Sequence, residues 1–265
     1  MRDIALVDML KAGLHFGHQQ SRRHPKMNPY IFTTRGGVSI INLEKTKAAL
    51  AQATSFVREV VAGGGTVLFV GTKRQAREII LAAAQSAGVP YVVDRWIGGL
   101  FTNFQHVRQL ITKLDKLKTD RAAGDHGKYT KKEQLEFDRE IERLEKLVGG
   151  LGKLERLPQA VFAVDIKTEK TAVREANAVH VPVIAMCDTN VNPKPVQYPI
   201  PANDDATKAI TYVTELLVAA VAEGRQQQDQ RLAAAAKAAA AAAEQAALAA
   251  TPVKLDAAAS ELTTD

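Results

Sequence analysis

The chain has 265 residues, of which 46% are hydrophobic, and its formal net charge is +6 with a pI near 9.3. This length allows one sizeable core with a small insertion, and the basic balance is compatible with an anionic partner without requiring one. A single cysteine, Cys187, excludes an intrachain disulfide and a CxxC metal site. No apolar stretch is long enough to span a membrane, and Asp3 and Asp8 argue against a signal peptide, so we predict a cytoplasmic protein.

The first distinctive segment is rich in cations and rings. From Leu14 to Phe32 the chain reads LHFGHQQSRRHPKMNPYIF, with neither helical nor strand periodicity. Cations contact phosphates and flat rings stack on unpaired bases, so this composition is typical of an RNA-binding surface. Gly17, Pro25 and Pro29 interrupt regular structure here, and we therefore expect the segment to be held largely by RNA.

Two elements are predicted between this segment and the main domain. Tyr30–Phe32 and Val38–Ile41 flank Gly36-Gly37, a pattern that predicts a small β-hairpin. A long helix is then predicted from Leu43 to Ala62, where three consecutive glycines end it.

Four short apolar runs and a weaker fifth predict the central strands. They lie at 66–71, 91–94, 160–165, 181–188 and 196–201. Because the runs are almost continuously apolar, they suit strands that are covered on both faces, as in a parallel sheet. Helical patterns follow at Lys73–Ala87, Glu169–Val179 and Asp204–Glu223. This alternation predicts an α/β fold with a doubly wound parallel sheet of five strands, in which Cys187 is buried.

An insertion interrupts the alternation after the second strand. Apolar residues recur at three-four spacing from Phe104 to Leu114 and at heptad spacing from Phe137 to Leu151, with a polar loop at 118–130. We predict an antiparallel helical hairpin, a coiled coil. Its outer faces carry charges of both signs, which are typical of a solvated face, and docking of another protein is the alternative.

These patterns divide the chain into four parts. Residues 1–104 form an N-terminal extension and the first half of the α/β domain, 105–156 the hairpin insertion, and 157–224 the second half of the domain. Residues 225–265 form an alanine-rich tail that offers few apolar side chains for docking, and we predict that it is disordered or marginally helical.

A search for phosphate-binding and catalytic motifs finds little. Neither GxxxxGK[ST] nor a GxGxxG after a strand occurs, and no catalytic constellation is present, so we assign no catalytic residue. The string GTKR places Lys73 and Arg74 at the start of a helix, where anions are attracted. The alternatives are contact with a nucleic-acid backbone, a solvated helix end, or the phosphate site of a nucleotide- or phosphosugar-binding enzyme.

Polar residues follow the last two predicted strands and suggest a metal site. Asp188 ends one strand and Asp204 follows the next, so the sheet brings both to one edge, where His15 or His18 could join them. We consider a single divalent metal, zinc or magnesium, bound by His18, Asp188 and Asp204, although no cofactor is required. The alternative role of Asp204 is the N-cap of the last helix.

The string RWIGGLFTNF, from Arg95 to Phe104, contains the only tryptophan. A guanidinium next to an indole offers phosphate contact and stacking together, so Arg95 and Trp96 are candidates for RNA contact. The alternative for Trp96 is a place in the core.

Several strings resemble one family. They are LKAGLHFGHQ, HPKMNPYIF, IINLEKT, LFVGTKRQA, RWIGGLFTNF, EANAVHVPVIAMCDTN and IPANDDA. In order and spacing they resemble the bacterial small-subunit ribosomal protein S2 family, from about Leu6 to Gly224, with the tail outside the resemblance. One departure is that the aromatic-rich stretch of the family before HPKM is basic here, at Ser21-Arg22-Arg23-His24.

The resemblance implies a flavodoxin-like sheet with a protruding helical hairpin. It also implies a non-enzymatic structural component of the small ribosomal subunit, on the solvent side near the junction of head and body. Such a protein binds small-subunit ribosomal RNA, contacts neighbouring ribosomal proteins, and helps to seat the large messenger-binding protein built of OB domains. Taken together, we predict RNA contacts from His15, His18, Arg22, Arg23, Lys26, Tyr30, Arg35, Lys73, Arg74, Arg95, Trp96 and Arg108.

Overall fold

The computed structural model describes residues 4–124, 129–152 and 154–249. A central sheet of five parallel strands has the order β5-β4-β6-β7-β8. Numbered by their order along the chain this is 2-1-3-4-5, the flavodoxin-like arrangement, which confirms the predicted fold class. The strands are β4 (Val67–Val70), β5 (Tyr91–Val92), β6 (Ala160–Ala163), β7 (Val183–Cys187) and β8 (Tyr198–Pro201).

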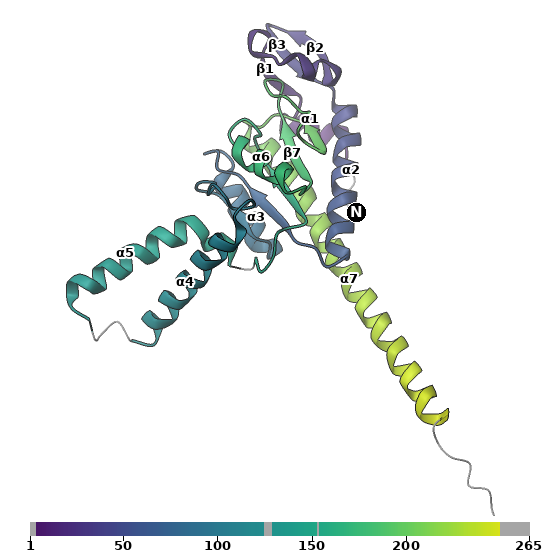
Figure 1. Ribbon diagram of the computed structural model, residues 1–265. Coiled ribbons are helices and arrows are strands. Elements are labelled where there is room, and N and C mark those ends of the chain that lie inside the picture. The colour runs from purple at the N-terminus through teal and green to yellow at the C-terminus, as the bar shows by residue number, and fades with distance from the viewer. Residues whose placement is uncertain (1–3, 125–128, 153, 250–265) are drawn as a thin grey trace, which may run out of the picture.

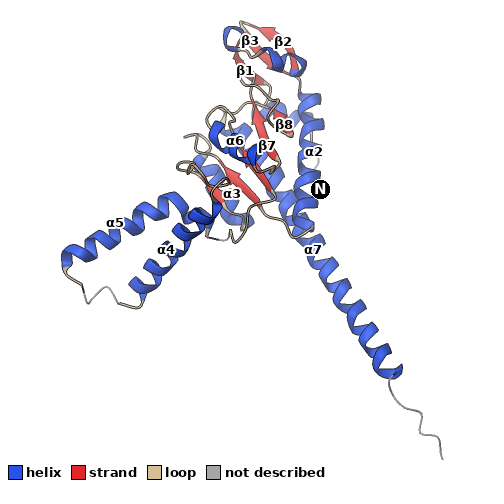
Figure 2. Ribbon diagram, viewed as in Figure 1, coloured by secondary structure: helices blue, strands red, loops and turns tan. Residues whose placement is uncertain are grey.

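Helices cover both faces of this sheet (Figures 1 and 2). On one face, α2 (Leu43–Ala62), α3 (Arg77–Ala87) and α7 (Thr207–Ala249) pack on residues such as Phe69 and Phe162. On the other, α6 (Lys170–Ala178) and the base of the hairpin cover Leu68, Val161 and their neighbours. The central strands β4, β6 and β7 are buried throughout, because their alternate side chains enter different cores.

The predicted insertion projects from the domain as two helices that lie side by side, α4 (Phe104–Ala122) and α5 (Lys131–Val148), followed by η4 (Gly149–Leu151). Between them lie Val107, Ile111 and Leu114 of α4 and Ile141, Leu144 and Val148 of α5. Ion pairs cross the outside, with 2.7 Å from Lys113 Nζ to Glu140 and 2.8 Å from Lys118 Nζ to Glu145. The loop expected at 118–130 is shorter than predicted, because α4 continues to Ala122. The description of the two helices as a coiled coil stays a prediction.

The N-terminal extension contains more structure than the sequence indicated. A three-stranded antiparallel sheet has the order β1-β3-β2, where β1 is Phe16–Gln19, β2 is Ile31–Arg35 and β3 is Val38–Ile41. The expected hairpin is therefore β2-β3, and β1 adds the third strand. Before and between these strands lie α1 (Leu6–Ala12), η1 (Gln20–Arg22) and η2 (Pro25–Tyr30).

Helix α7 crosses the predicted boundary at Gly224. The last helix was expected at Asp204–Glu223, but α7 runs without interruption from Thr207 into the alanine-rich segment as far as Ala249. A Cβ atom at Gly224 would lie 2.8 Å from the carbonyl oxygen of Arg58, so glycine here allows α7 to approach α2 closely and does not end a helix. The part of the tail beyond Ala249 lies outside the described residues.

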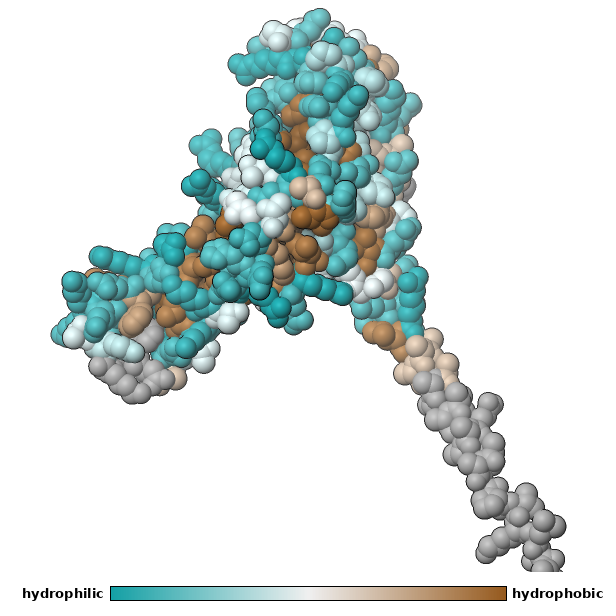
Figure 3. Space-filling model, viewed as in Figure 1, coloured by the Kyte–Doolittle hydropathy of each residue, from teal (hydrophilic) through white to brown (hydrophobic). Residues whose placement is uncertain are grey.

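The surface view in Figure 3 is hydrophilic over most of the N-terminal sheet, and apolar residues gather in the middle of the domain and toward the base of the hairpin. Within the described residues, no helix combines the length and the apolar character needed to cross a membrane.

Candidate functional site

The cation-rich segment is held by the chain itself. The backbone N–H of His18 donates to Thr189 Oγ1 at 2.8 Å, and the N–H of His24 donates to the Thr189 carbonyl oxygen at 2.8 Å. A Cβ atom at Gly17 would collide with the same threonine, so the glycine permits this close approach. Met27 of η2 is fully buried in the second core. The expectation that RNA holds this segment is wrong, because the loop after β7 and the core already fix it.

Six of the predicted phosphate-binding cations are exposed: Arg22, Lys26, Arg35, Arg74, Arg95 and Arg108. Arg23 is half-buried. Within the described residues, the ion pairs include none of these seven side chains. Their charges are therefore free to meet phosphates, and their role as RNA contacts stays a prediction.

Lys73 does not face solvent as the sequence suggested. Its Nζ lies 2.6 Å from Asp204 Oδ1, 2.6 Å from Asp205 Oδ1 and 3.6 Å from Asp165 Oδ2. Burial acts to lower the pKa of Lys73, but the three carboxylates outweigh it and raise the pKa above its ordinary value. The helix also starts later than predicted, at Arg77. Because three carboxylates already pair with this amine, Lys73 is corrected from a phosphate contact to an internal ion pair.

Trp96 is also corrected. The indole is 9% exposed and meets Phe101 edge-on, with ring centroids 5.1 Å apart. Its Nε1–H donates to the buried carboxylate of Glu175 at 3.2 Å, and the N–H groups of Gly99 and Phe101 donate to the same carboxylate at 2.8 and 3.1 Å. The core alternative is thus the one observed. Glu175 fixes the loop that carries Arg95, a role that the sequence did not suggest.

The remaining predicted RNA contacts are rings. Tyr30 is half-buried and packs against the second core, so only part of its ring can meet a base. His15 lies against Phe16, with ring centroids 3.9 Å apart, and burial lowers its pKa. His18 belongs to a polar cluster at the carboxyl edge of the central sheet.

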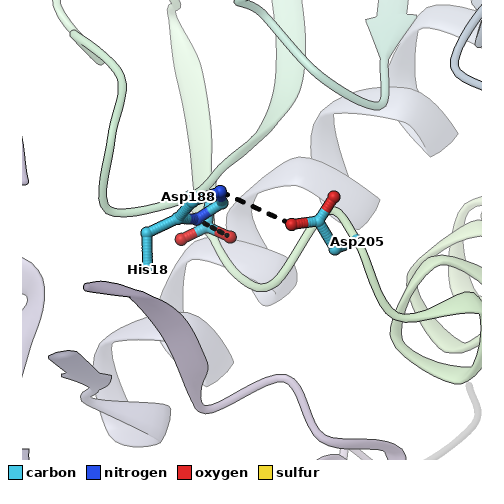
Figure 4. A group of neighbouring side chains, drawn as sticks. All are labelled: His18, Asp188 and Asp205. Atoms are coloured by element: carbon cyan, nitrogen blue, oxygen red, sulfur yellow. Dashed lines mark ion pairs between the residues drawn. The ribbon is translucent and has the colours of Figure 1, made fainter. Parts of the chain in front are cut away.

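This cluster joins three segments that are distant in sequence (Figure 4). His18 Nδ1 lies 3.1 Å from Asp188 Oδ2, and His18 Nε2 lies 3.4 Å from Asp205 Oδ2. One ligand atom from each residue can be chosen so that all three lie within 4.8 Å of one another. Asp188 is 1% exposed, so its carboxylate is held away from solvent and faces the His18 ring. Two carboxylates and an imidazole at this spacing are suitable ligands for a divalent cation.

The cluster corrects one predicted ligand. Asp204 is 2% exposed and pairs with Lys73, whereas the neighbouring Asp205 faces His18. Nor is Asp204 an N-cap, because α7 begins at Thr207. The side chain of Asn203 accepts from the N–H groups of Asp205 and Ala206 and closes a turn. Both aspartates of this turn pair with Lys73, but only Asp205 also reaches His18.

The charges of the cluster act on one another. A hydrogen bond to Asp188 raises the pKa of His18 against the effect of partial burial, and Asp205 adds to the rise. Burial acts to raise the pKa of Asp205, but Lys73 and His18 stabilise its anion, so the pKa is lowered overall. Burial raises the pKa of Asp204 to about 7, with repulsion from Asp165 and Asp188 acting in the same direction. The crevice at the strand ends is thus lined by carboxylates, which disfavours a phosphate ligand.

An apolar hollow of about 440 Å³ lies between α1 and the N-terminal sheet. Leu6, Val7, Leu10 and Phe32 line it and are 39, 60, 54 and 73% exposed, and Phe16 nearby is 51% exposed. Exposed apolar residues that gather in this way mark an interaction site. The sequence analysis missed this hollow, although the i, i+1, i+4 spacing in α1 was a readable signal.

The flavodoxin-like domain lines its strand-end crevice with its own ion pairs and has exposed cations on its N-terminal extension. These features suit a protein that binds an anionic macromolecule better than an enzyme that binds a small phosphate ligand. The comparisons identify the family. A family model described as Ribosomal protein S2 matches residues 9–224, and the chain belongs to that family, as the sequence motifs predicted. Its members are structural proteins, so the alternative of a nucleotide- or phosphosugar-binding enzyme is set aside.

Individual relatives agree with this assignment. The chain is 48% identical to a Small ribosomal subunit protein uS2 of Bifidobacterium longum over 84% of its own length and 80% of the relative. It is 48% identical to the protein of the same name from Coprothermobacter proteolyticus, over 85% of this chain and 84% of the relative. It is 47% identical to the protein of that name from Roseiflexus castenholzii, over 84% of this chain and 85% of the relative.

Proposed function

We propose that this chain is a structural component of the small ribosomal subunit and binds small-subunit ribosomal RNA through its N-terminal surface. The observation that carries the proposal is a set of exposed cations that form no ion pair within the described residues. Among them are Arg22 of η1, Lys26 of η2 and Arg35 of β2, on an N-terminal extension that the core fixes. A rigid surface loses little conformational entropy when it meets the phosphate backbone. Family membership supports the subunit role, and as a part of bacterial ribosomes the chain would act in the cytoplasm.

Charge reversal tests this proposal. The variant Arg22→Glu/Arg23→Glu should incorporate poorly into small subunits, and its binding to transcribed small-subunit ribosomal RNA should depend less steeply on salt. The control Arg139→Glu/Lys237→Glu makes the same change of charge on the hairpin and on the outer part of α7, and both control residues are exposed. Equal incorporation and equal salt dependence of the two double variants would contradict an N-terminal RNA surface.

The apolar hollow supports a second role, the seating of a neighbouring ribosomal protein, which we propose is the large messenger-binding protein built of OB domains. A short amphipathic segment of that partner would bury the exposed Leu10 and Phe32 side chains. Phe32→Ser should reduce the partner on purified subunits, measured by quantitative mass spectrometry, and leave this chain in place. Leu135→Ser, at a 50% exposed position of the hairpin, is the matched control. Full partner occupancy in Phe32→Ser would exclude this seat.

The third proposal is that His18, Asp188 and Asp205 bind one divalent metal. An imidazole ligand favours zinc over magnesium, which prefers oxygen ligands in octahedral geometry. The metal would link the N-terminal sheet to the edge of the main domain. Metal analysis of protein purified without chelator should find near-stoichiometric zinc that His18→Ala abolishes. His106→Ala removes an exposed histidine on α4 and should keep the metal. Background metal in the wild type would end the proposal.

A further inference from the structure

A second basic surface lies apart from the polar cluster and the apolar hollow. It is a groove of about 920 Å³ lined by η2, by one side of α2 and by the segment 193–199 that leads into β8. Three lysines from these three segments, Lys26, Lys45 and Lys194, line it, and no acidic residue is among its lining residues. Only Lys26 belongs to the sequence-predicted surface. The fold thus brings together two further cations that the sequence gave no reason to associate.

The lysines are placed to meet an anion. Lys26 and Lys194 are exposed, and neither occurs in an ion pair within the described residues. Lys45 donates through its Nζ to the carbonyl oxygen of Pro29, which fixes its position beside the groove. In the part of the chain that the structure describes, Lys45 forms no ion pair with a carboxylate. The only charged side chains in the lining are the three lysines, so a chain of anions in the groove can interact favourably with all three.

Proline and tyrosine rings and side-chain amides also line the groove. Pro29, Pro193 and Pro199 contribute rings with a fixed backbone angle, and Tyr30 contributes the part of its ring that the core leaves accessible. The exposed side-chain amides of Asn28 and Gln52 also line the groove. Amides can donate to and accept from the edges of unpaired bases, and rings can contact their faces. A rigid lining means that the groove needs no rearrangement to accept a ligand.

We propose that this groove binds an unpaired strand of RNA, with phosphates on Lys26 and Lys194 and bases against the proline and tyrosine rings. The proposal rests on the RNA-binding function proposed above and adds to it a defined path for a single strand. An A-form duplex offers side chains only a wide, shallow groove and regular backbones, which fit protrusions better than a concave lining. An acidic peptide would meet the lysines but would have no use for the flat apolar surfaces.

The test uses the full chain and fluorescein-labelled dodecauridylate, with anisotropy measured at salt concentrations between 50 and 200 mM. Each lost phosphate contact lowers the slope of log affinity against log salt by about 0.7 for a single strand. The double variant Lys26→Ala/Lys194→Ala should therefore have a slope smaller by about 1.4. The matched control Lys116→Ala/Lys237→Ala removes two exposed lysines from the hairpin and from the outer part of α7, and should keep the wild-type slope.

The outcomes separate this proposal from the general function. If the slope of log affinity against log salt is unchanged in Lys26→Ala/Lys194→Ala, the proposal that the groove binds RNA is overturned. The general RNA-binding function still stands in that case if Arg22→Glu/Arg23→Glu weakens binding to small-subunit ribosomal RNA. A twelve-base-pair RNA duplex that binds as tightly as the single strand, with the same dependence on the two lysines, overturns the single-strand assignment. Competition by polyglutamate at equal charge concentration assigns the groove to an acidic protein. Failure of the wild type to bind small-subunit ribosomal RNA overturns the function itself.

Discussion

The carboxylate of Glu175 fixes the loop that runs from Trp96 to Phe101. It is 8% exposed and accepts hydrogen bonds from the Trp96 indole and from the backbone N–H groups of Gly99 and Phe101. In Glu175→Gln one acceptor oxygen becomes an NH₂ group, which cannot accept from a facing N–H. At least one buried donor then loses its partner, at a cost of about 1–3 kcal/mol.

Glu175→Ala removes all three acceptor contacts and leaves a cavity, so we expect a loss of roughly 3–6 kcal/mol. Against a typical total stability of about 5–15 kcal/mol, this variant is close to unfolding, and Glu175→Gln is the safer measurement. The only tryptophan of the chain is itself one of the donors. Its fluorescence therefore reports on the loop, while far-ultraviolet circular dichroism reports on the whole domain in the same urea titration.

For Glu175→Gln we expect a lower urea midpoint by both probes and a red-shifted native emission, because the indole loses a charged acceptor. Glu136→Gln removes an exposed carboxylate on α5 and controls for the change in net charge. If the two variants unfold at the same midpoint and show the same native emission, the reasoning about the buried carboxylate is refuted.

Three further perturbations test other contacts. Gly17→Ala should cost about 1–3 kcal/mol in urea unfolding, because its Cβ meets Thr189, whereas Gly98→Ala has open space and should be nearly neutral. Leu144→Ala, at a fully buried position of the hairpin, should cost about 2–5 kcal/mol by the same measurement. Burial raises the pKa of Glu169, so the stability contributed by this group is complete below its unfolded pKa and is lost as pH rises through the folded pKa. Glu169→Gln should therefore show a smaller fall in thermal midpoint between pH 4 and 8, and an unchanged fall would contradict this.

The central sheet could be predicted from the sequence because each strand is buried on both faces and so is apolar at every position. The runs around Phe69 and Phe162 are examples. Strand β1 could not be predicted in this way, since FGHQ carries no apolar alternation. It is fixed by long-range contacts, such as the hydrogen bond from His18 to Thr189, 171 residues further along the chain.

The candidate site was predicted in part for the same reason. Strand order brought Asp188 and the turn of Asp204 to one edge, and His18 was one of two histidines that could join them. Exposure of cations such as Arg22 follows from their poor tolerance of burial. The sequence does not show which way each side chain of a turn points. Asp204 was therefore predicted as the metal ligand, whereas Asp205 is the residue that faces His18. Trp96 has both an apolar body and a polar N–H, and only the position of Glu175 decides that it points inward.

Helix α7 has a consequence for how the molecule occupies space. Its 43 residues correspond to about 65 Å of helix, and Arg231 donates a hydrogen bond to the carbonyl oxygen of Ala62 at the end of α2. The stretch from there to Ala249 reaches about 27 Å further, away from the domain (Figure 1). Because the part of α7 up to about Arg231 packs against α2, the part beyond it extends a helix that is already nucleated. A fluorescent probe on the outer part of α7 would therefore rotate together with the domain. Its polarisation would report how the domain is oriented within any larger assembly.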